Sequence, residues 1–327
     1  MKHITPEKTT HHAELLGNRV RKQYRHLRKR FKRAGIDCFR LYDWDIPEVR
    51  AVVDWCAGHA VIAEYVRKQT GPEWLPAMAE AVRAALDLPA DHVHVKQRRT
   101  KTEDELRYTR LAEDNKRFTV SERDLKFWVN LDDFLDTGLY SDHRDTRVLV
   151  RDLAAGQDFL NLFAYTGAFS CAAAAGEAAS TGTVDRSQTN LDWARDNMQL
   201  NGFAGDAHRF EQADVDTFLS RAAKRGESWS LVFCDPPSFF KDVKAGKAFD
   251  INRDHIRLLR QVLKVTRPGG TVFFSTNHQR FEPRLTELSV DGLRELTPKT
   301  IPEDYRNRRI HRCWRMTARG SGRPNRG

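Results

Sequence analysis

Between residues 158 and 277, short apolar runs alternate with longer segments that have the spacing of helices. The runs are FLNLF (159–163), TGTVD (181–185), AHRFEQAD (207–214), SLVFCD (230–235) and TVFFSTN (271–277). The segments between them, such as NLDWARDNMQLNG, are long enough to be crossover helices. Strands that alternate with helices predict a parallel sheet covered on both faces. We therefore expect this part of the chain to have an α/β fold.

The residues before this region have a different pattern, typical of a small α+β domain. A basic helix is expected from about residue 11 to 33, ending near Gly35, with its apolar face at positions 15, 20, 24, 27 and 31. Strands are expected at 39–43, 59–66, 92–98 and 117–120, a helix at 73–87, and a charged surface loop at 98–106. The predicted domains are 1–120 and 121–317, followed by a basic tail at 318–327.

The chain is basic, with 55 Lys and Arg against 45 Asp and Glu and a formal net charge of +10. This balance favours an anionic partner, for which nucleic acid is the default, although a basic surface can also serve solubility alone. Arg21 and Arg25 on the first helix are candidates for phosphate contacts. The alternative is that this helix is simply solvated on its charged faces.

Several classes of protein and site are not favoured. Residues 1–12 contain no apolar core of a signal peptide, and no stretch approaches the length of a membrane span. The five cysteines are scattered and form no CxxC pair, so neither a metal site nor a disulfide framework is predicted. We expect a reduced, cytoplasmic protein without membrane or metal.

Polar residues follow the first three strands of the α/β region, where ligands of such sheets bind. Gly167 follows the first strand and permits a tight turn close to a ligand. Asp185 ends the second strand, about 20 residues later, and suits the two hydroxyls of a ribose; an acid near a helix start is the alternative. Asp214 ends the third strand and suits an adenine amino group, or else caps the following helix.

The fourth strand ends in the most specific sequence, Asp235-Pro236-Pro237-Ser238-Phe239. Two prolines fix the backbone and cannot continue a helix or a sheet ladder. Phe239 then offers a flat face on which a base can stack. The pattern predicts a rigid turn that docks a nucleobase.

Together these residues resemble class I S-adenosylmethionine-dependent methyltransferases, and more narrowly the bacterial 23S rRNA guanine-N7 methyltransferases, the RlmK half of the two-headed RlmKL enzyme. The resemblance rests on RLYDWDIPE (40–48), WVNLDDFLDTGLYSDHR (128–144), DFLNLFAYTGAFS (158–170), TVDRSQTNLDWARDNMQLNG (183–202), QAD (212–214), DPPSF (235–239), FDINRDH (249–255) and RNRRIHRCW (306–314). It covers most of the chain. It implies a Rossmann-like methyltransferase sheet with a small N-terminal α+β domain, in a stand-alone version of that half.

The resemblance implies S-adenosylmethionine as cofactor. The residues it assigns to the methionine end lie on and after the first strand: Asn161, Tyr165, Thr166 and Gly167. Asp185 would bind the ribose, with Arg186 or Ser187 beside it, and Asp214 the adenine. Asp142 and Arg144 would grip the cofactor, Arg144 through the methionine carboxylate; the alternative for Arg144 is a surface ion pair.

The implied substrate is a guanine N7 in 23S rRNA, either free or in an immature large ribosomal subunit. N7 has an in-plane lone pair and no proton, so no general base is needed. We expect Asp235 and the Pro236 carbonyl to lie near the reacting centre and to favour the positive charge that develops on the purine. Ser238 and Phe239 would contact the base.

Four alternatives differ from this interpretation in residues or in cofactor binding, both of which can be checked. A 5-methylcytosine enzyme needs a cysteine nucleophile after a later strand, where this chain has Ser275-Thr276-Asn277-His278, and Cys234 is expected in the core. An adenine-N6 enzyme usually carries DPPY or NPPY, from which Ser238-Phe239 departs. A non-catalytic RNA-binding or ribosome-assembly factor would not bind the cofactor. A dehydrogenase would carry a glycine fingerprint that is absent.

Overall fold

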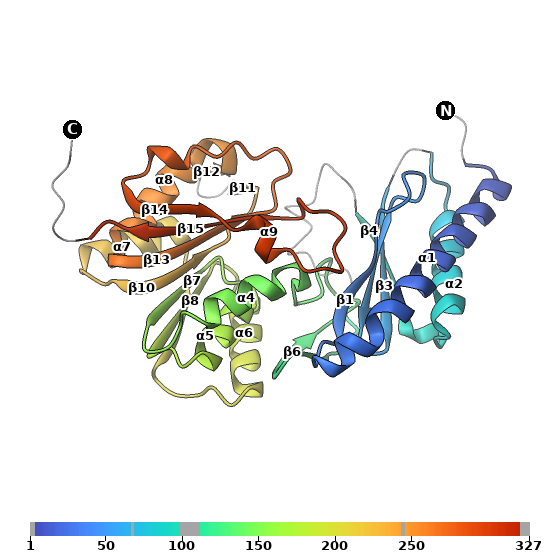
Figure 1. Cartoon of the computed structure of the whole chain (residues 1–327), viewed down its shortest axis with the longest axis horizontal. Coiled ribbons are helices and arrows are strands. Elements are labelled where there is room, and N and C mark those ends of the chain that lie inside the picture. Colours follow the sequence, from blue (N-terminus) through green and yellow to red (C-terminus); the bar gives the residue numbers. More distant parts are fainter. Residues whose placement is uncertain (1–3, 67–68, 99–111, 243–245, 321–327) are drawn as a thin grey trace. The chain divides into compact units, whose positions relative to one another are not determined.

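The computed structural model describes residues 4–66, 69–98, 112–242 and 246–320, and the chain forms two compact units (Figure 1). The first unit contains Met1–Ser141 with Glu303–Asn307, and the second contains Asp142–Pro302 with Arg308–Gly327. This division differs from the boundary expected at residue 120. The hairpin of β5 (Phe118–Glu122) and β6 (Leu125–Val129) belongs to the first unit, where Ile36 and Glu122 form a β-bridge. Most of the loop expected at 98–106, and most of the expected tail, lie outside the described residues.

A four-stranded sheet and two helices make up most of the first unit, and the sequence predicts both helices and three of these four strands. The sheet order is β1-β2-β3-β4, with only β3 and β4 parallel. The bounds are α1 (Pro6–Arg33), β1 (Cys38–Asp43), β2 (Ala51–Cys56), β3 (His59–Tyr65), α2 (Trp74–Leu86), the 3-10 turn η1 (Ala90–His92) and β4 (Val93–Arg98). The strand β2 is an element that the sequence reading did not include.

The apolar face of α1 differs in one position from the expected one. Leu16, Val20, Leu27 and Phe31 are buried, whereas Leu15 is only half-buried. Positions 16, 20, 27 and 31 keep the i, i+4 and i, i+7 spacing of a single helix face, and residue 15 lies about 100° away around the helix. The expectation for Leu15 was therefore wrong.

The second unit is built on a seven-stranded sheet with the order β14-β15-β13-β10-β7-β8-β9. The bounds are β7 (Asp158–Leu162), β8 (Ser180–Asp185), β9 (His208–Gln212), β10 (Trp229–Cys234), β13 (Thr266–Thr276), β14 (Val290–Glu295) and β15 (Arg312–Ala318). The five strands from β13 to β9 pair in parallel, as predicted. The sheet is nevertheless mixed, because β15 runs antiparallel to both of its neighbours. The sequence reading placed no strand at β14 or β15.

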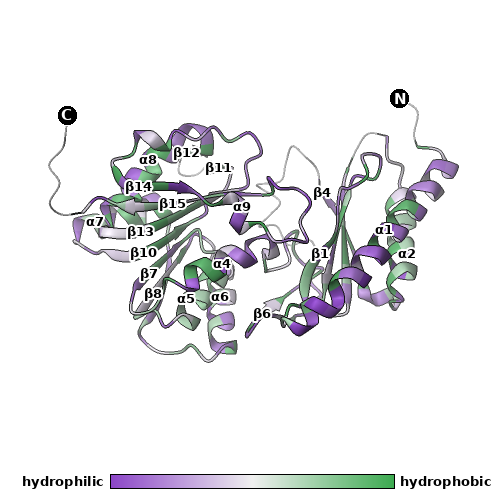
Figure 2. Cartoon of the chain, in the orientation of Figure 1, coloured by the Kyte–Doolittle hydropathy of each residue, from purple (hydrophilic) through white to green (hydrophobic). Residues whose placement is uncertain are grey.

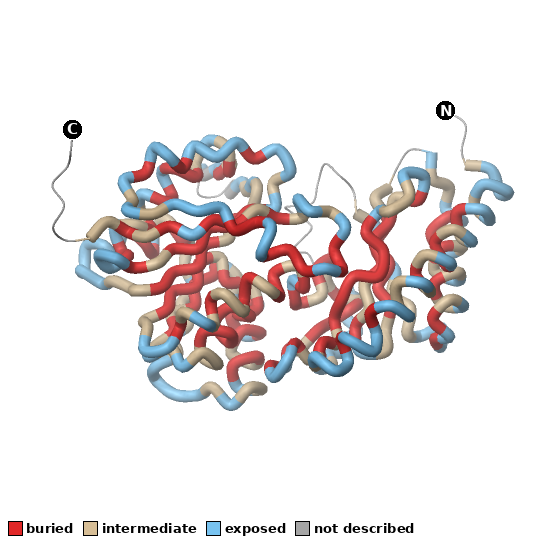
Figure 3. Tube along the Cα trace, in the orientation of Figure 1, coloured by how far each residue is buried: buried red, intermediate tan, exposed pale blue. Residues whose placement is uncertain are grey.

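Helices cover both faces of this sheet (Figure 1). Their bounds are α4 (Arg144–Arg151), α5 (Ala168–Ala175), α6 (Gln188–Leu200), α7 (Val215–Lys224) and α8 (Ile251–Lys264). Alternate residues of each central strand enter two separate cores. Val232 and Cys234 pack with α7 and α8, whereas Leu231 and Phe233 pack with α4 and α5. Figure 2 shows hydrophobic residues concentrated in the strands, and Figure 3 shows these strands buried.

Shorter elements connect the sheet to its surroundings. They are the 3-10 turns η2 (Ser141–His143) and η3 (Leu285–Glu287), the short helix α9 (Thr297–Thr300), and the hairpin of β11 (Phe239–Asp242) and β12 (Lys247–Asp250). The hairpin directly follows the DPP turn, where the sequence left open whether a loop covers the substrate. Within the described parts of the chain, no helix combines the length and hydropathy needed to cross a bilayer.

The helices α4 and α5 approach closely at Gly176, and this approach predicts a stability effect. A Cβ at Gly176 would lie 2.2 Å from the Arg151 carbonyl oxygen and 3.0 Å from the Ala154 Cβ. Gly176→Ala should cost about 1–3 kcal/mol of stability because backbone must move to make room. In thermal unfolding, the midpoint should fall by roughly 2–12 °C.

Gly71→Ala is the matched control, because a Cβ there meets no atom within 4 Å. Its midpoint should change by less than about 2 °C. Equal midpoints for the two variants would contradict the close approach of α4 and α5.

Candidate active site at the strand ends

The candidate site lies at the edge of the sheet where the chain leaves β7 and β10 in opposite directions. β7 pairs in parallel with both β8 and β10, and β10 pairs in parallel with β13. After β7 the chain continues to β8 on one side of the sheet, and after β10 it continues to β13 on the other side. The boundary between β7 and β10 is therefore the topological switch point. Ligands of open α/β sheets bind at this point, beyond the carboxyl ends of the strands. The two loops that border it are residues 163–167 and the DPP turn.

The loop after β7 has an unusual backbone. Phe163, Tyr165 and Gly167 have φ angles of 56°, 50° and 72°, in the left-handed region that non-glycine residues seldom adopt. A Cβ at Gly167 would also lie 2.7 Å from the Ala194 Cβ of α6. The Asn197 side chain, fully buried in α6, donates to the Thr166 carbonyl (2.9 Å). Such a conformation persists only where the surroundings fix it, and it is common at ligand sites.

Asp185 holds the same loop from the end of β8. Its carboxylate accepts hydrogen bonds from the backbone N–H of Tyr165 (2.9 Å) and Ser187 (2.9 Å) and from Asn190 Nδ2 (3.2 Å). Burial raises the pKa of Asp185 above its ordinary value, although these three donors oppose the shift. Oδ2 accepts only the Tyr165 bond among these three, which leaves acceptor capacity for a ribose hydroxyl.

The other predicted cofactor residues lie in different environments. Ser187 is the N-cap of α6, accepting from Asn190 N, and the exposed Arg186 stacks its guanidinium 5.6 Å from the Phe240 ring centroid. Asp214 caps α7 by accepting from Thr217 N (3.1 Å), the alternative considered from the sequence. A capping carboxylate retains further acceptor positions, so its adenine role stays a prediction.

Two predicted residues are buried inside the second unit. The Asn161 side chain donates to Ser170 Oγ (3.0 Å), which in turn contacts Thr183 Oγ1 (2.8 Å). Asn161 thus joins β7 to α5 and β8. Arg144 is the first residue of α4 and is only 2% exposed. An exposed surface ion pair, the alternative considered for Arg144, does not fit this burial.

The DPP turn is fixed by contacts to the neighbouring strand. Ser275 Oγ at the end of β13 donates to Asp235 Oδ1 (2.6 Å), and Ser238 Oγ donates to Asn277 Oδ1 (2.8 Å). Pro236 is buried, whereas the Phe239 side chain is 43% exposed. Cys234 before the turn is fully buried, which confirms the prediction that it belongs to the core.

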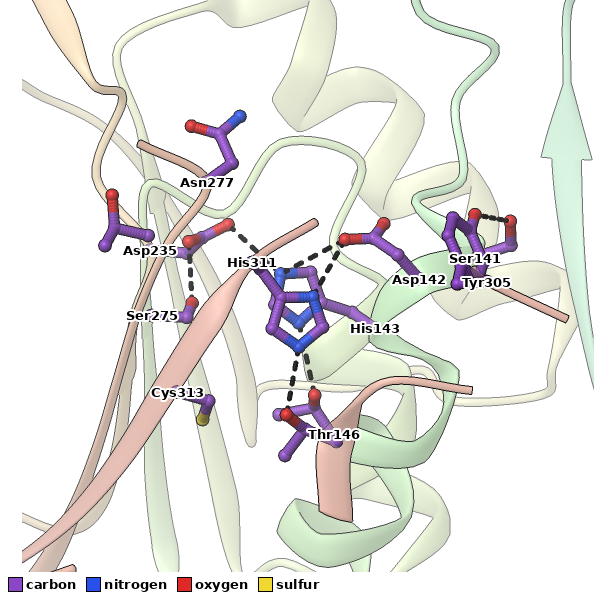
Figure 4. Close-up of polar contacts among 12 residues, drawn as sticks. Ser141, Asp142, His143, Thr146, Asp235, Ser275, Asn277, Tyr305, His311 and Cys313 are labelled. Carbon is purple, nitrogen blue, oxygen red and sulfur yellow. Dashed lines mark hydrogen bonds and ion pairs between the residues drawn. The ribbon is translucent and has the colours of Figure 1, made fainter. Parts of the chain in front are cut away.

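Behind this turn lies a cluster of two imidazoles and two carboxylates (Figure 4). His311 Nδ1 is 2.9 Å from Asp142 Oδ2, and His143 Nε2 is 3.8 Å from Asp235 Oδ2. The two rings stack with centroids 4.0 Å apart and an interplanar angle of 12°. Burial, with a smaller effect of the adjacent His311, lowers the pKa of His143 well below its ordinary value. His143 is therefore neutral at pH 7.

Sequence reasoning missed the roles of His143, Ser275 and His311 in this cluster. His143 and His311 were quoted within DHR and RNRRIHRCW, but nothing in their spacing joins positions 168 residues apart. The cluster also brings together three side chains that can ligate a metal, those of Asp142, His143 and His311. However, a metal between two parallel stacked rings would lie outside both ring planes, where the nitrogen lone pairs do not point. The geometry favours a hydrogen-bonded cluster over a metal centre.

Arg21 and Arg25, the predicted RNA contacts, lie on α1 in the first unit. Arg25 is exposed, and Arg21 is half-buried with Nη1 donating to Asn18 Oδ1 (3.2 Å). Neither environment excludes a phosphate contact.

A family model for S-adenosylmethionine-dependent methyltransferases matches residues 42–298, which is most of the chain. The chain belongs to this family. The expected fold, a Rossmann-like methyltransferase sheet with a small N-terminal domain, is confirmed, and S-adenosylmethionine is the cofactor.

Solved structures of methyltransferases share the fold of this methyltransferase. The protein SMU.776, solved with S-adenosylhomocysteine, is 20% identical, with a TM-score of 0.71 over 92% of this chain and 81% of that one. An enzyme from Agrobacterium tumefaciens is 16% identical, with a TM-score of 0.62 over 87% and 91%. The tRNA m1G37 methyltransferase of M. jannaschii is 14% identical, with a TM-score of 0.52 over 92% and 77%.

The residues at the strand ends fit the cofactor. S-adenosylmethionine carries a positive sulfonium and an ammonium group. The side chains of Asp142 and Asp235, near this edge of the sheet, remain 14% and 28% exposed. Carboxylates in a partly desolvated site attract such charges more strongly than they would in water. Asp185 has an acceptor oxygen of the kind that a ribose hydroxyl requires, and its ribose role stays a prediction.

Asp185→Asn should weaken cofactor binding. An amide has one acceptor oxygen, whereas Asp185 uses two oxygens for three protein donors and would have to serve a ribose as well. A lost charge-assisted hydrogen bond corresponds to roughly 10- to 100-fold in affinity. Isothermal titration with S-adenosylmethionine should show a Kd increased by at least about tenfold. The control is Asp192→Ala, which removes an exposed acid of the following helix α6 that pairs with Arg195. Wild-type affinity for Asp185→Asn would overturn the assignment.

His143 should make stability depend on pH. The folded protein keeps His143 neutral, while the unfolded chain protonates it near pH 6.5, so unfolding takes up a proton below that pH. Stability present above pH 6.5 is lost as the pH falls. The unfolding midpoint of His143→Gln should therefore decline less steeply from pH 7 to pH 5 than that of the wild type. His26→Gln, at an exposed position of α1, should keep the wild-type slope; equal slopes for all three proteins would contradict a buried neutral imidazole.

Proposed function

We propose that this enzyme methylates N7 of a guanine in 23S rRNA, either in free RNA or in an immature large ribosomal subunit. The observation that carries the proposal is the exposed ring of Phe239 on a turn fixed from the neighbouring strand, at the carboxyl end of β10. An exposed aromatic face beside a methyl donor suits a stacked base, and stacking contributes about 1–3 kcal/mol per base.

The cysteines favour this reaction over 5-methylcytosine formation. Attack on a pyrimidine ring requires a thiolate within reach of the base. All five cysteines are buried, and Ser275 and Asn277 occupy the end of β13. Burial raises the pKa values of Cys171, Cys234 and Cys313 above the ordinary range, which disfavours a thiolate.

The mechanism requires positioning rather than proton transfer. When bound, the cofactor supplies an electrophilic methyl group, whose bonding electron pair remains on sulfur as N7 bonds to carbon. Phe239 stacks the purine, while the turn holds N7 in line and excludes water. Asp235 and the Pro236 carbonyl favour the positive charge that the purine gains. Orientation of this kind can lower a barrier by roughly 7–11 kcal/mol at best.

The charge of the chain supports an RNA substrate. Most of the basic residues of α1 are exposed, at positions 22, 25, 28, 29, 30, 32 and 33. Phosphate contacts of this type contribute affinity without sequence preference. A base inside a duplex must also be unstacked before it can reach the turn.

The first test is to incubate the enzyme with isotope-labelled S-adenosylmethionine and unmodified bacterial 23S rRNA, or immature large subunits. After digestion, mass spectrometry should identify labelled 7-methylguanosine at one site. Labelled 5-methylcytidine, 6-methyladenosine or 1-methylguanosine would overturn the target atom but keep the cofactor. No label on either substrate would favour a non-catalytic RNA-binding factor.

The same assay links the activity to the turn. Phe239→Ala should lower kcat/KM by about 10- to 100-fold through lost stacking, without changing the Kd for S-adenosylmethionine. Leu293→Ala removes an equally exposed apolar side chain from β14 and should leave the rate unchanged. Equal rates for the two variants would remove Phe239 from the proposed site.

A further inference from the structure

Asn277 and Ser238 join the ends of two neighbouring strands beside the proposed base site. β10 and β13 pair in parallel, with Cys234 opposite Phe274, so the chain leaves both strands at the same edge. Ser238 Oγ then donates to Asn277 Oδ1 at 2.8 Å. Figure 4 draws Asn277 at the same strand ends as Asp235 and Ser275. Asn277 therefore lies within the group of side chains that surrounds the DPP turn.

The hydrogen bond from Ser238 determines which half of the Asn277 amide is available. The oxygen faces Ser238, so the Nδ2 group, with its two hydrogens, is directed away from Ser238. Asn277 is exposed, and no hydrogen bond from its Nδ2 joins it to any other described residue. The side chain consequently turns its donor end toward a base bound at this edge of the sheet, while its oxygen faces Ser238.

A lone donor beside N7 distinguishes the two purines. Next to N7, guanine carries the acceptor O6, whereas adenine carries an amino donor. An asparagine with both amide groups available is suited to adenine, because it can accept from that amino group and donate to N7. With its oxygen held toward Ser238, Asn277 presents Nδ2, which can donate to O6 of guanine but would meet the amino donor of adenine.

We propose that Asn277 selects guanine by donating from Nδ2 to O6, and that Ser238 sets the orientation of the amide. The inference rests on the proposed function, since it requires N7 to be the methylated atom. Phe239 follows Ser238 directly in the chain, so the stacking surface and the residue that orients Asn277 come from one turn. Position 277 also lies where a 5-methylcytosine enzyme would need its cysteine nucleophile. In this chain, the residue at that position would recognise the base and would not attack it.

The test combines enzyme variants with base analogues at the single position that is methylated. The RNAs carry guanosine, inosine or 2-aminopurine there; inosine keeps O6, and 2-aminopurine lacks it. We measure single-turnover rates of methyl transfer from radiolabelled S-adenosylmethionine. The wild type should methylate inosine within about threefold of guanosine and 2-aminopurine about 10- to 100-fold more slowly, as expected for one lost base contact.

Asn277→Ala should slow guanosine to the rate of 2-aminopurine while leaving the rate of 2-aminopurine unchanged. Asn277→Asp should slow guanosine further and raise the relative rate of 2,6-diaminopurine, whose 6-amino group can donate to the carboxylate. Gln188→Ala is the control, because it removes an exposed amide that contacts only Asp192 in its side-chain hydrogen bonding. Each variant must bind S-adenosylmethionine with the wild-type Kd.

The failures of the inference and of the proposed function can be told apart. If Asn277→Ala slows guanosine and 2-aminopurine by the same factor, Asn277 supports the turn and does not read the base. If the wild type forms no 7-methylguanosine on any of these RNAs, the proposed function fails and the reading role fails with it. Retained discrimination against 2-aminopurine in Asn277→Ala would assign the reading of O6 to another residue.

Discussion

The parallel pairing of β7 with β10 is the interaction on which the rest of the second unit depends. Phe159 lies opposite Leu231 and Leu162 opposite Cys234, so the two strands end together. The chain then leaves them in opposite directions, toward β8 on one side and toward β13 on the other. Because helices cover both faces, a ligand meets the sheet at this opened edge. Because the five strands from β13 to β9 are parallel, the segments that follow them lie along the same edge of the sheet although they are far apart in the sequence.

Two sets of buried hydrogen bonds fix the borders of that edge. On one side, Asp185 and Asn197 hold the left-handed loop that precedes α5. On the other, Ser275 holds the Asp235 carboxylate, with the stacked imidazoles of His143 and His311 behind it. Buried polar networks that are fully satisfied are rigid. Rigidity suits a reaction in which the enzyme contributes orientation and charge and no proton has to move.

The sequence predicted the repeating part of the fold and the residues that follow each strand. Apolar runs and helical spacing are local, so β7, β8, β9, β10 and α6 could be placed to within a few residues. It could not predict β15, because its run RCWRMTA mixes charged and apolar residues and its antiparallel place depends on distant strands. The cluster around His311 was missed for the same reason: its members meet only after the sheet has formed. The role of Asp185 in holding the loop needed coordinates, since the acid alone does not show its donors.

The reversed strand β15 has a consequence for biosynthesis. It lies between β13 and β14, and at Arg312–Ala318 it is the last strand among the described residues. Until these residues leave the ribosome, β13 presents an unpaired edge, and β14 lacks the neighbour with which it pairs. An unpaired edge of this kind invites pairing between nascent chains. His311, which immediately precedes the strand, arrives equally late. The sheet of the second unit is thus completed only after Arg312–Ala318 have been synthesised, and a chain that stopped before His311 would lack both the strand between β13 and β14 and the imidazole that contacts Asp142.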